Sequence, residues 1–146
     1  MLGQLLSNCF INVAVVAWLS AQILKTLFTF LRTKKFDPER LVGAGGMPSS
    51  HSALVCSLTV SVARVVGFAS AEFAICFALS GIVMYDAMGV RRAAGEQAKV
   101  LNRLAQSDEE ESTSQKALKE RLGHTPLEVL GGALLGILVA VLMPIR

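Results

Sequence analysis

The sequence has few of the residues that usually carry soluble-enzyme or nucleic-acid chemistry. Its 146 residues include two histidines, one tryptophan and one tyrosine. A nucleic-acid surface needs a basic face with stacking aromatic rings, so we expect no nucleic-acid partner. Cys9, Cys56 and Cys76 lie in apolar runs without metal-ligand spacing, which predicts free, buried thiols. We expect no metal ion and no cofactor.

Charge is also missing from the first 24 residues. A helix of that length is about 36 Å long, enough to cross a hydrocarbon core of about 30 Å. The basic residues come after the apolar run, as in a retained membrane anchor. Apolar residues make up 53% of the chain, more than in an ordinary soluble domain. These features predict an integral membrane protein.

The apolar pattern predicts an all-α fold, a membrane helical bundle with about four transmembrane helices in a single domain over 1–146. Gly132 and Gly136 form a G-x-x-x-G pattern that lets helix backbones approach closely in lipid. Such small-residue faces also favour a homo-oligomer. The second and third spans are joined by a short turn at 67–71, which leaves a shallow re-entrant path open. The four spans are expected at about 5–31, 52–71, 72–90 and 126–144.

Basic residues are concentrated in the polar stretches 32–51 and 91–125, which hold eleven of the fourteen Lys and Arg residues. The positive-inside rule places both stretches in the cytoplasm and both termini outside. Within the cytoplasmic insertion, residues 92–106 are expected to form an amphipathic surface helix. Residues 108–114 are expected to be a solvated acidic loop.

The two histidines occur in similar settings. His51 follows the turn-forming run Gly46-Met47-Pro48-Ser49-Ser50, and His124 follows Gly123 and precedes Pro126. Each opens an apolar helix, and two spans separate them, so both lie on the same membrane face. A helix N-terminus offers unpaired N–H groups and partial positive charge to an anion. Four basic residues are assigned to the same face, which favours phosphate binding: Lys25, Arg32, Arg91 and Arg92.

These residues resemble three motifs of the type 2 phosphatidic acid phosphatase superfamily, which is related to the vanadium-dependent haloperoxidases. Lys25 and Arg32 have the spacing of its first motif, a Lys, six residues and Arg-Pro. Pro48-Ser49-Ser50-His51 resembles the second motif, Pro-Ser-Gly-His. His124-Thr125-Pro126-Leu127-Glu128 resembles the end of the third, His-x-x-x-Asp after a Ser-Arg. The strings GGMPSSHSA, YDAMGVRRAAGEQA and LGHTPLEVLGG are similar to the divergent branch of the superfamily.

The chain departs from the superfamily pattern at each motif. Thr33 stands in place of Pro, Ser50 in place of Gly and Glu128 in place of Asp. No Ser-Arg precedes His124 at the usual distance. Arg91 or Arg92 would then supply the missing guanidinium, with residues 93–123 as an insertion.

The resemblance implies a metal-independent phosphatase whose substrate is a lipid phosphate, such as phosphatidic acid or a prenyl phosphate or diphosphate. It implies that His124 attacks phosphorus, that Glu128 orients His124, and that His51 protonates the leaving group. Asp86 is expected to support the site by pairing with one of the arginines. The implied phosphate-binding residues are Lys25, Arg32, Gly46, Ser49, Ser50, Arg91 and Arg92.

Structural roles remain open for several of these residues. Thr125 and Glu128 also form the sequence of a capping box, and Lys25 and Arg32 also suit interfacial anchors. The departures from the motifs favour a second hypothesis. In it the protein is a catalytically inactive lipid-head-group binder or scaffold that retains the family pocket.

Overall fold

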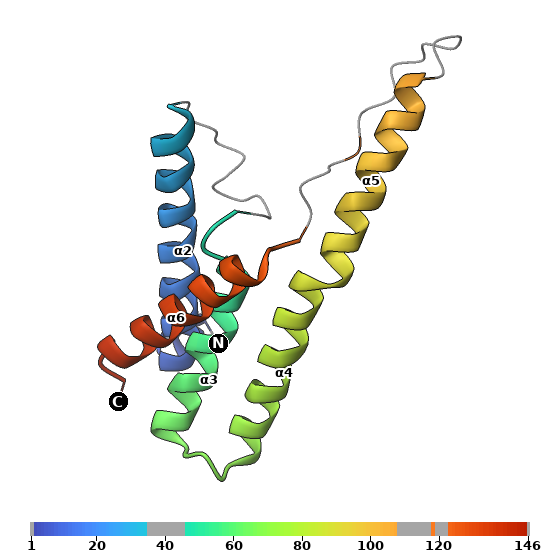
Figure 1. The fold of residues 1–146 in the computed structure, drawn as a ribbon. Coiled ribbons are helices and arrows are strands. Elements are labelled where there is room, and N and C mark those ends of the chain that lie inside the picture. The colour runs from blue at the N-terminus through green and yellow to red at the C-terminus, as the bar shows by residue number, and fades with distance from the viewer. Residues whose placement is uncertain (1, 35–45, 108–117, 119–122, 146) are drawn as a thin grey trace.

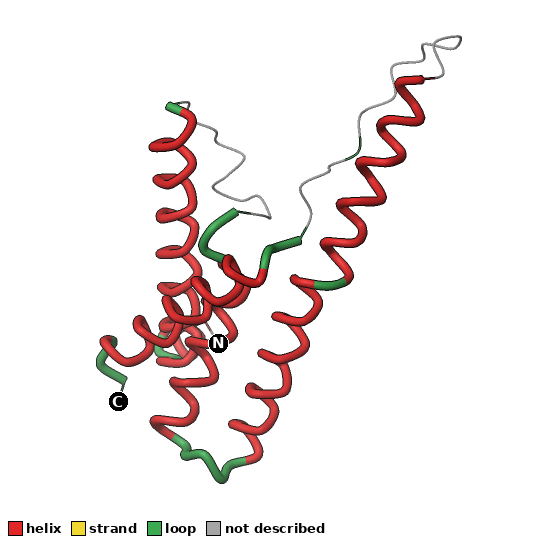
Figure 2. Tube along the Cα trace, viewed as in Figure 1, coloured by secondary structure: helices red, strands yellow, loops and turns green. Residues whose placement is uncertain are grey.

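The computed structural model describes residues 2–34, 46–107, 118 and 123–145, and all regular structure in these ranges is helical (Figure 2). The prediction of an all-α fold is therefore confirmed. Two helical stretches, Cys9–Thr33 and Ala71–Leu104, are long and apolar enough to cross a membrane. The helices in chain order are α1 (Leu2–Leu6), α2 (Cys9–Thr33), α3 (Ser50–Val65), α4 (Ala71–Met88), α5 (Val90–Ser107) and α6 (Pro126–Leu142).

The predicted bounds of two spans are wrong. The first does not run unbroken from residue 5, because Asn8 caps a new helix and its side chain accepts hydrogen bonds from the N–H groups of Phe10 and Ile11. The second ends at Val65 and does not reach residue 71. Gly67 has a φ of +101°, in the left-handed region that glycine adopts most easily, and Ser70 caps α4.

Helix α3 lies at the centre of the bundle, in contact with α2, α4 and α6 (Figure 1). It is unusually polar for that position, but its buried hydroxyl groups have hydrogen-bond partners. The hydroxyl oxygens of Thr59 and Ser80 lie 2.7 Å apart and form a hydrogen bond that links α3 to α4. The Ser61 hydroxyl donates to the carbonyl of Ser57. Hydrogen bonds of this kind hold helices together in lipid, where apolar contacts alone provide little driving force.

Helices α3 and α6 run in the same direction and approach closely through glycine. A Cβ atom on Gly132 would overlap the carbonyl oxygen of Ser49, and one on Gly136 would overlap that of Ala53. At the other end, Arg64 donates to the carbonyl oxygens of Ala140 and Met143 near the C-terminus of α6. The G-x-x-x-G pattern therefore packs within the chain, and it brings the N-termini of α3 and α6 to the same end of the bundle.

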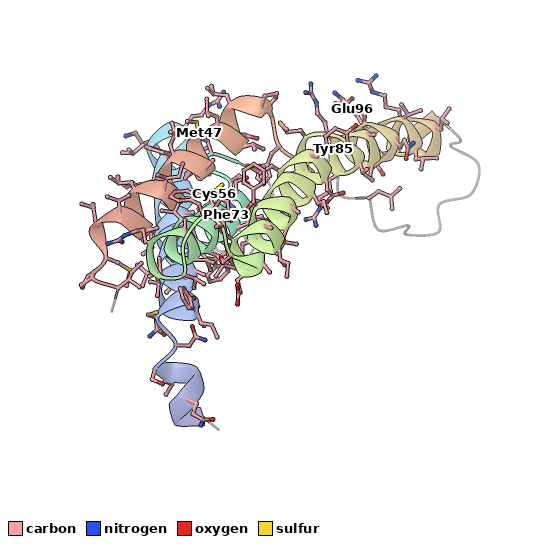
Figure 3. All side chains as sticks on the ribbon, turned by 90° about the horizontal axis from the view of Figure 1, so that it is seen from below. Met47, Cys56, Phe73, Tyr85 and Glu96 are labelled. Carbon is pink, nitrogen blue, oxygen red and sulfur yellow. The ribbon has the colours of Figure 1, made fainter. Side chains whose placement is uncertain are left out.

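Helix α5 occupies Val90–Ser107 and includes the predicted amphipathic helix at 92–106. It continues α4 and leads away from α2, α3 and α6 (Figure 1). Figure 3 shows the same separation, with Glu96 on the outlying arm and Cys56 and Phe73 within the bundle. The predicted acidic loop at 108–114 lies outside the described residues.

Candidate active site

The N-terminus of α3 is built from buried serines. Gly46, with a φ of +89°, turns the chain before the helix, and Ser49 is its N-cap. The Ser49 hydroxyl accepts hydrogen bonds from the N–H of Ser52 at 3.4 Å and from the Ser52 hydroxyl at 3.0 Å. Ser49, Ser50 and Ser52 are all buried, whereas His51 is half-buried. The predicted turn therefore holds His51 in the first turn of α3.

The N-terminus of α6 carries a capping box that also engages His124. The Glu128 carboxylate accepts from the Thr125 N–H at 2.8 Å, and the Glu128 N–H donates to the Thr125 hydroxyl at 3.3 Å. The same carboxylate oxygen, Oε2, lies 3.4 Å from Nδ1 of His124. One carboxylate therefore makes both the capping contact with Thr125 and the contact with the His124 ring.

Backbone contacts fix the His124 loop against its neighbours. The Ser49 N–H donates to the carbonyl of Glu128, and the His124 N–H donates to the carbonyl of Ala87, each at 2.9 Å. Gly123 has a φ of +85°, and a Cβ atom there would overlap the backbone of Arg91 and Arg92. Only glycine fits this contact, and together these contacts bring the ends of α3, α4 and α6 and the first turn of α5 around His124.

Lys25 extends from α2 into the same region. Its side chain is 1% exposed, and Nζ lies 3.4 Å from the Ser50 hydroxyl. The charges of Lys25 and His51 both affect the ionisation of His124. The ionisation of His51 is in turn affected by the charges of Arg91, Lys25 and Asp86. His51, His124 and Lys25 are therefore close enough for their charges to influence one another.

The arginines lie at the edge of this group. Arg91 Nε is 2.6 Å from Asp86 Oδ2, with the two side chains 48% and 35% exposed, so the expected ion pair is present. Arg92 is exposed, and so is Arg32 in the last turn of α2, about two helical turns beyond Lys25. The structure brings together Lys25, Ser49, Ser50, His51, His124 and Glu128, with Asp86 and Arg91 beside them.

Gln22 is a buried polar residue that the sequence analysis missed. It lies one turn before Lys25 on α2 and is 4% exposed, and its Oε1 has no hydrogen-bond partner among the described residues. Its position three residues before Lys25 in an apolar helix does not by itself predict burial, because the neighbouring helices supply the surroundings. In the described ranges, no three His, Cys, Asp or Glu side chains gather where a metal ion would bind.

The sequence is similar to that of a curated membrane protein. A Bacillus subtilis (strain 168) protein named "Uncharacterized membrane protein YuiD" is 40% identical over 152 residues, which cover 96% of each chain. No solved structure matches. Together with the long apolar helices, this relative identifies the class as a helical membrane protein. Residues 6–139 match the family described as "Divergent PAP2 family", and the chain belongs to that family.

Burial lowers the pKa of His124, and the neighbouring Glu128 carboxylate opposes this shift. The unfolded imidazole has a pKa near 6.5, so below that value the unfolded chain binds more protons at this residue than the folded protein does. The contribution of His124 to stability is therefore retained above pH 6.5 and lost as the pH falls from there toward the lower folded pKa.

We expect the free energy of unfolding in detergent to fall between about pH 7.5 and about pH 5.5, and to fall less in His124→Gln. Thermal unfolding of both proteins across this range measures the difference. Equal pH dependence in the two proteins would show that His124 titrates alike in the folded and unfolded states.

Proposed function

We propose that the protein is a metal-independent phosphatase that hydrolyses a lipid-linked phosphate through a phosphohistidine intermediate. The observation that carries the proposal is the setting of His124. Its ring is buried, its Nδ1 faces the Glu128 carboxylate, and the charges of His51 and Lys25 act on it. Membership of the divergent PAP2 family supports the same chemistry.

The first step transfers the phosphoryl group to the protein. With Nδ1 protonated and held by Glu128, Nε2 of neutral His124 carries the lone pair that attacks phosphorus. The P–N bond forms as the P–O bond to the lipid breaks. The negative charge of the bound phosphate favours the protonated form of His51, which gives its proton to the departing lipid oxygen so that the lipid leaves as an alcohol. Glu128 balances the positive charge that develops on His124.

The second step releases the phosphate. His51, now neutral, removes a proton from water, and the resulting nucleophile attacks phosphorus as the P–N bond breaks. Inorganic phosphate leaves, and His124 and His51 return to their starting protonation states. The charge on the transferred oxygens requires fixed donors throughout, because phosphoryl transfer depends mainly on positioning and electrostatic stabilisation.

Several groups are available as those donors. Lys25 provides a buried positive charge beside the Ser50 hydroxyl. The Ser49 N–H already donates to the backbone carbonyl of Glu128. We therefore assign the Ser49 hydroxyl and the first N–H groups of α3 to the phosphate. Arg91 is favoured over Arg92 as the guanidinium donor because its charge acts on His51. Arg32 and Gly46 complete the proposed set of phosphate-binding residues.

The active site is proposed to lie at the cytoplasmic membrane surface, with both termini outside. This orientation rests on the basic residues of 32–51 and 91–125 and on the positive-inside rule. A phosphate head group would enter between the ends of α3, α4 and α6 while its acyl or prenyl tail stays in lipid. The substrate class is a phosphate monoester or diphosphate on a lipid.

We expect purified protein in detergent with EDTA to release phosphate from phosphatidic acid or a prenyl phosphate. His124→Ala should reduce release by on the order of 10³-fold or more because it removes the nucleophile. Unchanged release in this variant would exclude His124 as the nucleophile. Lipid phosphate binding without release by the unaltered protein would indicate a head-group-binding protein instead.

The two roles of Glu128 can be separated by a pair of variants. Glu128→Gln keeps an oxygen acceptor for the capping box and removes the negative charge beside His124, so turnover should fall by on the order of 10²-fold or more. Thr125→Ala should lower stability by about 1 kcal/mol and retain turnover, because it removes a capping hydroxyl only. Phosphate release and thermal unfolding measure both. Equal loss of turnover in the two variants would contradict an orienting role.

A further inference from the structure

Helix α5 has an apolar face that the bundle does not cover. Val90, Val100 and Leu101 are 65%, 56% and 53% exposed. At about 100° per residue these side chains lie on one side of the helix. Lys99, Arg92 and Arg103 point to the other side, where Glu96 is the only acidic residue of the helix. The exposed face is therefore apolar and bordered by net positive charge.

A neighbouring flank of α5 contacts Leu118. The Asn102 side chain donates to the Leu118 carbonyl and accepts from the Leu118 N–H, both at 2.9 Å. Ala98, one turn earlier on that flank, is 7% exposed. This pairing leaves the face of Val90, Val100 and Leu101 available for a different partner.

The first turn of α5 lies close to the membrane surface if α4 crosses the bilayer. The 18 residues of α4 extend about 27 Å, close to the thickness of a hydrocarbon core, so α5 begins where α4 would leave the membrane. Ile82 and Tyr85 on the last turns of α4 are 67% and 75% exposed, so α4 also has uncovered apolar side chains close to the junction. Gly89 joins the helices with φ −100° and ψ −90°, outside helical geometry.

We propose that α5 docks on the membrane surface through this face, with its basic residues against anionic phospholipid head groups. A bend at Gly89 would let the helix lie along the interface. Apolar side chains would then leave water, and the long stems of lysine and arginine would reach the head groups. Each basic residue near an anionic leaflet strengthens such binding.

Charge favours lipid over a second copy of the chain as the occupant. Helix α5 has four basic residues and one acidic residue, Glu96, so two copies of the helix would repel each other through their net positive charge. An anionic leaflet supplies the opposite charge. The proposal does not depend on phosphatase activity, because it concerns the exposed face of α5 and not His51 or His124.

The test uses the full chain in vesicles of phosphatidylcholine with or without phosphatidylglycerol. A fluorophore is attached to Leu101→Cys on the apolar face, or to Lys99→Cys on the basic face as the matched control. The unaltered chain, treated alike, gives the background from Cys9, Cys56 and Cys76. We expect the label at 101 to be quenched by brominated lipid and protected from iodide, and the label at 99 to show the reverse.

Anionic lipid should increase the contrast between the two positions. Removing charge with Arg103→Gln should weaken docking about fivefold, read as the phosphatidylglycerol content needed for half-maximal lipid quenching at 101. Equal iodide quenching at 101 and 99 in both lipids would overturn the proposal. Protection of 101 from both quenchers, increasing with the protein-to-lipid ratio, would also overturn it, because it would identify a second copy as the occupant.

Discussion

The close packing of α6 on α3 is the contact on which the rest of the structure depends. Gly132 and Gly136 bring α6 onto the backbone of Ser49 and Ala53, and the Ser49 N–H donates to the Glu128 carbonyl. Because the two helices run in the same direction, this packing places two helix N-termini side by side. Their partial positive charges then add in one region, which favours an anion.

The positions of His51 and His124 follow from that arrangement. His51 lies in the first turn of α3, and His124 comes shortly before α6, so this packing places both residues at the same end of the bundle. Lys25 enters from α2 and is almost fully buried beside Ser50. A buried ammonium group is costly unless hydrogen bonds or opposite charges compensate it, and the Ser50 hydroxyl is one partner of Lys25.

Local patterns in the sequence predicted much of this structure. The four main apolar helices, the helix at 92–106, the capping box of Glu128 and the ion pair of Asp86 are each determined by residues within a few turns of one another. The pairing of the histidines followed from counting spans between them. The assignment of His124, His51 and the basic residues to catalysis stays a prediction.

Other features depended on contacts between distant residues. The burial of Gln22 and the fit of Gly123 against Arg91 and Arg92 cannot be deduced from local spacing, because the neighbouring helices supply their surroundings. The predicted bounds of the first two spans were wrong for a different reason. Hydropathy continues through Asn8 and Gly67, whereas side-chain capping and a positive φ stop the helices there.

The convergence of His51 and His124 can be tested most directly by cross-linking in native membranes. Cysteines placed at both positions should be joined efficiently by a short bifunctional thiol reagent, detected by mass spectrometry of the linked peptides. The matched pair of His51→Cys with Leu127→Cys should react poorly, because Leu127 is 65% exposed on the outer surface of α6. Failure of the first pair to cross-link, or equal linkage in both pairs, would contradict a shared site.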